Sequence, residues 1–93
     1  MSAESYWCHV QNLCQRLFLK HGQNITVPLE PDPNGPLKVF DDVDVSATPF
    51  RFVAYIMWLR YQPQSFEWFC KLLETRRELV DDCLCSLTTA LVS

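Results

Sequence analysis

The sequence predicts a mainly α-helical fold, a small bundle of three or four helices with one Pro-rich excursion between the first and second helix. Apolar residues recur at steps of three and four over long stretches, which is the period of an amphipathic helix. Residues typical of helix starts and stops flank these stretches. The length of 93 residues suits one domain spanning residues 1–93, and the 48% apolar content is too high for intrinsic disorder.

The first helix is predicted over about residues 5–21. Ser2 or Ser5 can cap its start by accepting a hydrogen bond from a free backbone N–H. Lys20 lies where the helix dipole favours a cation, and Gly22 follows at the position where a left-handed residue commonly ends a helix. Polar residues occupy much of the outer side, and the apolar stripe comprises Trp7, Val10, Cys14, Leu17 and Phe18.

Residues 23–48 interrupt the helical pattern. Prolines recur there, and proline is not accommodated inside a helix. Two short β-like runs, within residues 25–29 and 37–40, flank a stretch of turn residues, so a loose β-hairpin and an ordered segment without strand pairing are both open. Such a long connection in a compact domain is often functional. The prolines are Pro28, Pro31, Pro33 and Pro36, and the acidic residues are Glu30, Asp32, Asp41, Asp42 and Asp44.

The second helix is predicted over about residues 50–61 and is expected to be central. The preceding Thr48-Pro49 pair combines a favourable N-cap with a proline suited to the first turn. Only Arg51 and Arg60 are charged in this stretch, so apolar side chains cover nearly every face. A helix that is apolar on all faces is buried on all faces, and Trp58 should therefore be in the core.

The C-terminal helix or helices are predicted over about residues 65–92. Ser65 is another capping residue, and no Gly or Pro follows it. The i,i+4 pairs Glu67–Lys71 and Arg77–Asp81 favour a helix that reaches at least Asp81. Asp81-Asp82 could cap a separate fourth helix, and we favour a break or kink at this position.

The apolar stripe of the C-terminal third is the predicted interaction surface. A chain this short buries a modest core, and the first helix offers one apolar face. Part of the stripe should therefore lack a partner within the chain and pack on a protein partner or in a homodimer. Six Phe, three Trp and three Tyr are consistent with this, because aromatic residues are enriched at interface hot spots. The predicted interface residues are Phe66, Phe69, Leu73, Val80, Leu84, Leu87 and Leu91.

The charge balance argues against a dedicated nucleic-acid-binding protein. Eight Lys and Arg against eleven Asp and Glu give a net charge of −3 and a pI of about 5.2. Nucleic-acid binders usually carry a basic stripe that neutralises phosphates. A small basic spot remains at Lys71, Arg76 and Arg77, so the alternative function is a nucleic-acid-associated regulator that uses these residues.

Cysteine and histidine form no recognisable catalytic or metal-binding motif. Cys8 and Cys14 lie off one another's face on a helix, and Cys83 and Cys85 point nearly opposite ways. Structural zinc sites instead hold closely spaced cysteine pairs on turns. Both histidines lie on the first helix without a Gly-rich loop nearby, and the acidic run at residues 41–44 lacks the spacing of an EF-hand. We expect no catalytic residues, no metal and no cofactor.

Targeting signals are not evident. The N-terminal residues show no basic region followed by an apolar run, and the most apolar stretch, residues 50–59, is far shorter than the roughly 20 residues of a membrane span. Five cysteines without a disulfide-framework spacing suggest reduced thiols and an intracellular location. The predicted function is a non-enzymatic protein-interaction or self-association module, such as an adaptor or a small viral or regulatory accessory factor.

Overall fold

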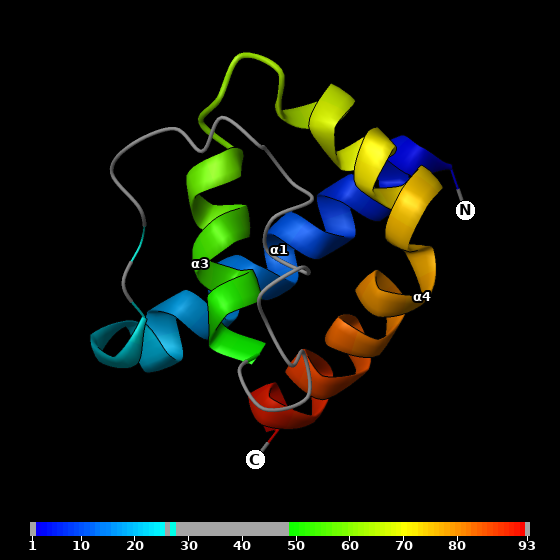
Figure 1. Ribbon diagram of the computed structural model, residues 1–93. Helices are drawn as coiled ribbons and strands as arrows, with labels where there is room; N and C mark the ends of the chain where they lie inside the picture. The colour runs from blue at the N-terminus through cyan, green and yellow to red at the C-terminus, as the bar shows by residue number, and fades with distance from the viewer. Residues whose placement is uncertain (1, 26, 28–48, 93) are drawn as a thin grey trace.

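The computed structural model describes residues 2–25, 27 and 49–92 (Figure 1). It is mainly helical, as predicted: α1 spans Ala3–His21, a single 3-10 turn η1 spans Gly22–Asn24, α3 spans Pro49–Leu59 and α4 spans Ser65–Val92. The predicted hairpin region falls almost entirely outside the described residues. No described helix is both long and apolar enough to cross a membrane.

Helix α1 begins at its predicted cap and ends differently from the prediction. The Ser2 hydroxyl accepts a hydrogen bond from the Ser5 backbone N–H at 3.1 Å, which satisfies one of the free donors of the first turn. Gly22 was expected to be left-handed, but it has φ −55° and ψ −31°, so that prediction is wrong. The chain instead tightens into η1, where the Ile25 N–H donates to the Gly22 carbonyl at 3.1 Å.

Helix α3 is buried over most of its length, as its composition predicts. It packs mainly against α1, and every residue from Phe52 to Leu59 is buried. Trp58 is 5% exposed, and its ring stacks on that of Trp68 in α4 with a centroid distance of 6.0 Å. The helix ends in a tight turn, in which the Gln62 N–H donates to the Leu59 carbonyl at 2.9 Å.

Helix α4 is bent at Arg76, which has the non-helical angles φ −139° and ψ 37°. The first half, residues 65–75, crosses the N-terminal end of α1, and the second half, residues 77–92, runs down beside the rest of the fold (Figure 1). The predicted break at Asp81-Asp82 is wrong. Asp81 does not cap a new helix because its carboxylate bonds laterally, to side chains of α1 and of its own helix.

The core is a single cluster in which all three helices take part. Phe69 of α4 packs near the N-terminal end of α1. Its ring centroid lies 4.7 Å from that of Trp7 and 5.8 Å from that of Tyr6. Leu17 and Leu87 are also fully buried in this cluster, so both halves of α4 contribute to it. The bend therefore lets one long helix pack along a compact molecule whose largest dimension is 31 Å.

Candidate interaction surface

The seven residues predicted to form an interface divide into two groups. Four of them are buried in the core of the chain itself, among them Leu87, which was expected to have few partners within the chain. The bend at Arg76 explains this, because it directs both halves of α4 onto the same core. The buried residues are Phe69, Leu73, Val80 and Leu87, whereas Phe66, Leu84 and Leu91 retain exposed surface.

Aromatic side chains remain exposed at the turn between α3 and α4, which we call the α3–α4 corner (residues 60–68). Tyr61 is 75% exposed and Phe66 is 37% exposed. The guanidinium of Arg60 lies 5.1 Å from the centre of the Tyr61 ring, a cation–π arrangement. Tyr61 was counted into the central helix from the sequence, and its exposure follows from its position in the turn after Leu59.

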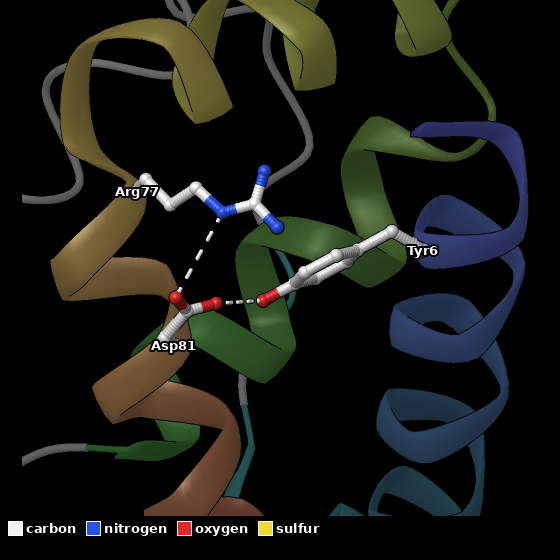
Figure 2. Close-up of polar contacts among 3 residues, drawn as sticks. All are labelled: Tyr6, Arg77 and Asp81. Atoms are coloured by element: carbon white, nitrogen blue, oxygen red, sulfur yellow. Dashed lines mark hydrogen bonds and ion pairs between the residues drawn. The ribbon is translucent and has the colours of Figure 1, made fainter. Parts of the chain in front are cut away.

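Three side chains join α1 to α4 just beyond the bend (Figure 2). The Tyr6 hydroxyl donates a hydrogen bond to Oδ1 of Asp81, and Nε of Arg77 lies 3.9 Å from Oδ2 of the same carboxylate. The Arg77 guanidinium also lies 5.4 Å from the centre of the Tyr6 ring. Of these contacts, the sequence predicted only the i,i+4 pair, because Tyr6 and Asp81 are far apart in the chain.

The Tyr6–Asp81–Arg77 cluster fixes the direction of the second half of α4. Farther along, Nζ of Lys20 donates to the Leu91 carbonyl at 2.9 Å. These two contacts place residues 81–91 beside residues 6–20, so the second half of α4 runs alongside α1 in the same direction. Arg77 and Asp81 are more than half exposed, so their ion pair is screened by water and contributes little to stability.

Tyr6 should make the fold sensitive to alkaline pH. Burial, and then the hydrogen bond to Asp81, raises the pKa of Tyr6 well above its usual value. The folded chain therefore keeps this proton while the unfolded chain releases it near a pH of about 10, so stability falls as the pH rises through that value. We expect Tyr6→Phe to cost about 1 kcal/mol at neutral pH and to flatten the decline above about pH 10. Denaturant titrations of both proteins across this range measure the difference, and parallel curves would contradict the assignment.

The predicted basic spot is partly neutralised in the structure. Arg77 faces the Asp81 carboxylate and the Tyr6 ring. Arg76 lies at the bend, where its Nη1 donates to the Thr75 carbonyl at 3.3 Å. Lys71 is exposed on the first half of α4, on the other side of the bend. The side chain of Arg77 is thus engaged within the fold, which weakens the case for a phosphate-binding site.

The five cysteines are all free thiols and differ in exposure. Cys8 and Cys85 are exposed, Cys70 is half-buried, and Cys14 and Cys83 are buried. Burial, reinforced by the neighbouring Cys83, raises the pKa of Cys14, whereas burial and the Asp82 carboxylate raise the pKa of Cys83 to about 12. No group of three His, Cys, Asp or Glu residues in the described part of the chain is arranged to hold a metal ion.

This difference in exposure predicts the order of thiol modification. Because the thiolate is the reactive form, Cys8 and Cys85 should react with a disulfide reagent first and Cys70 more slowly. Cys14 and Cys83 should react only after denaturant is added. Timed quenching followed by peptide mass spectrometry measures the order, and rapid modification of Cys14 in the native chain would contradict the packing of α1.

Comparisons of the chain with protein-family models, with curated proteins and with solved structures found no match. The function is therefore argued from the geometry of the described residues alone.

Proposed function

We propose that the chain is a non-enzymatic protein-interaction module that contacts its partner, a second copy or another protein, through the α3–α4 corner. The observation that carries this proposal is the exposure of two aromatic side chains at the corner, Phe66 and Tyr61, the latter beside the Arg60 guanidinium. Tyr and Arg are the residue types enriched at interface hot spots. Of the interface residues predicted from the sequence, Phe66 belongs to the proposed surface, whereas Phe69, Leu73, Val80 and Leu87 are buried in the core.

The chemistry of the buried groups supports a binding role over a catalytic one. Every buried side chain among the described residues is apolar, a tyrosine or a cysteine. Their burial raises the pKa values of Cys14 and Cys83, which keeps both thiols protonated and unreactive. Cys14 and Cys83, the two buried thiols, are therefore held in their protonated, unreactive form.

The solution mass tests this proposal. Light scattering from micromolar to high micromolar concentration should show the parent rising from 10.9 kDa towards twice that mass. In samples that have not been unfolded and refolded, the double variant Tyr61→Ser/Phe66→Ser should stay monomeric with an unchanged circular dichroism spectrum. Val92→Ser is the matched control, because Val92 is 81% exposed in the last turn of α4, whereas the corner includes the first turn of that helix. A double variant that associates like the parent would overturn the corner as the contact surface, and a monomeric parent would assign it to a different protein.

The alternative, a nucleic-acid-associated regulator that uses Lys71, Arg76 and Arg77, has less support because Arg77 is engaged with Asp81. It predicts an electrophoretic shift that weakens steeply as salt is raised, since phosphate contacts release bound counterions. The protein-interaction proposal predicts no shift at either of two salt concentrations. A salt-sensitive shift that is lost in Lys71→Ala/Arg76→Ala would favour the alternative.

A further inference from the structure

We propose that the second half of α4, residues 77–92, exchanges between two copies of the chain. We call this segment the arm. In the exchanged dimer, α4 is straight in both copies. The arm of each copy packs on α1 of the other copy, in the position that the arm of that other copy occupies in the monomer. The inference is independent of the α3–α4 corner and rests on the bend at Arg76.

The bend in α4 has no local cause in the sequence. Sharp kinks in helices are almost always found at Pro, at Gly or Ser, or where a group inserts into the backbone hydrogen bonds. Residues 65–92 contain no Gly or Pro. Thr75, directly before Arg76, donates its hydroxyl to the Lys71 carbonyl at 2.9 Å, but Thr88 and Thr89 make the same bond to the Leu84 and Cys85 carbonyls where the helix is unbroken. The other neighbours of Arg76, Leu72 to Glu74 and Arg77 to Leu79, are good helix formers. A straight helix is therefore available to this segment, and the packing of the arm on α1 imposes the bend.

The two halves of α4 are attached to the fold in different ways. The first half is fixed by aromatic contacts on both sides, since Phe69 packs on Trp7 and Trp68 stacks on Trp58. The arm carries an aliphatic and thiol face, Val80, Cys83 and Leu87, and two hydrogen bonds join it to α1: from Tyr6 to Asp81, and from Lys20 to the Leu91 carbonyl. A second copy offers the same α1, so these contacts to α1 can form between two copies.

The length of a straight α4 identifies the occupant as a second copy. At a rise of about 1.5 Å per residue, 28 helical residues extend about 42 Å. The largest dimension of the closed molecule is 31 Å, so a straight α4 carries the arm beyond its own chain. This uncovers both the arm's apolar face and the α1 surface that it leaves. A second copy with a straight α4 exposes the same two surfaces. The arm of each copy can then cover α1 of the other, which is the condition for exchange of an identical element.

A pair of substitutions at the hinge tests the proposal. Arg76→Ala and Arg76→Gly both remove the guanidinium, and the half-buried position tolerates a smaller side chain. Glycine is less favourable than alanine in a helix interior, and an exchanged dimer contains two straightened hinges. We therefore expect Arg76→Ala to form the dimer about 20-fold more tightly than Arg76→Gly after refolding at high micromolar concentration. Size-exclusion chromatography with light scattering measures the dimer fraction of each.

The matched control is the same pair of substitutions at Glu74, which is exposed and helical in both the closed and the exchanged form. Glu74→Ala and Glu74→Gly should differ in melting temperature but give equal dimer fractions. Equal dimer fractions for the two Arg76 variants, or a difference at Glu74 as large as that at Arg76, would overturn the proposal.

An isotope-filtered NMR experiment identifies the contacts in the dimer. Labelled and unlabelled Arg76→Ala chains are mixed, unfolded and refolded together. Exchange predicts contacts between chains from Leu87 to α1, whereas contacts between Phe69 and Trp7 stay within one chain. A dimer whose Leu87 contacts are all within one chain overturns the exchange and leaves the corner proposal standing. Dilution also distinguishes the exchanged dimer from a dimer formed through the α3–α4 corner. The exchanged dimer dissociates into monomers only as fast as its arms unfold.

Discussion

Replacing Leu87 by Asp should unfold the chain. Leu87 is 0% exposed, and it was predicted from the sequence to lie on an outer surface, where the same change would only have separated subunits. In the structure it lies in the core, so the substitution removes packing worth about 2–5 kcal/mol and also buries an unpaired carboxylate. Since small domains are stable by only about 5–15 kcal/mol, most of the helical circular dichroism should be lost at neutral pH.

Leu19→Asp is the control for this experiment. It makes the same chemical change at a position that is 78% exposed, where the expected cost is within about 0.5 kcal/mol. The two variants should therefore differ sharply in their urea midpoints. A Leu87→Asp chain that keeps its full helical signal and a monomeric mass would show that the arm does not pack on the core.

Trp58→Ala should cause the second largest loss. Trp58 is 5% exposed in α3, and removing its indole leaves a cavity in the core. The expected cost is about 3–5 kcal/mol, which lowers the melting temperature of a domain of this size by more than about 12 °C. Differential scanning calorimetry measures this shift.

Trp68 provides the comparison, because it forms the other side of the same stacked pair and is only half-buried. Trp68→Ala removes the same atoms and the same ring contact, but it leaves a space that water can fill. It should therefore cost clearly less than Trp58→Ala. Equal losses for the two variants would contradict the deeper burial of Trp58.

The parts of the fold that the sequence predicts well depend on local signals. The burial of α3 follows from a run of apolar residues on every face, and the start of α1 follows from Ser2. These features need no knowledge of distant residues. Gly22 shows the limit of such signals, because a glycine after a helix permits a left-handed stop without requiring one, and here the chain tightens into a 3-10 turn.

The bend in α4 and the candidate surface depend on contacts between distant residues. The residues around Arg76 include no Gly or Pro, and the bend is held by Tyr6–Asp81 and Lys20–Leu91, which join opposite ends of the chain. If residues 65–92 formed one straight helix, part of their apolar stripe would need a partner outside the chain. Once the helix is bent onto α1, Leu87 is internal, and the exposed aromatic surface lies at Tyr61 instead.

The central claim is that α4 is bent at Arg76 in the monomer and packs with both halves on one core. NMR of a dilute, monomeric sample tests this most directly, through backbone carbon shifts along residues 65–92 and contacts of the Tyr6 ring. The structure predicts helical shifts on either side of a non-helical Arg76, with the Tyr6 ring close to both Phe69 and Arg77 of the same chain. Uninterrupted helical shifts through Arg76, without a contact from Tyr6 to Arg77, would contradict it.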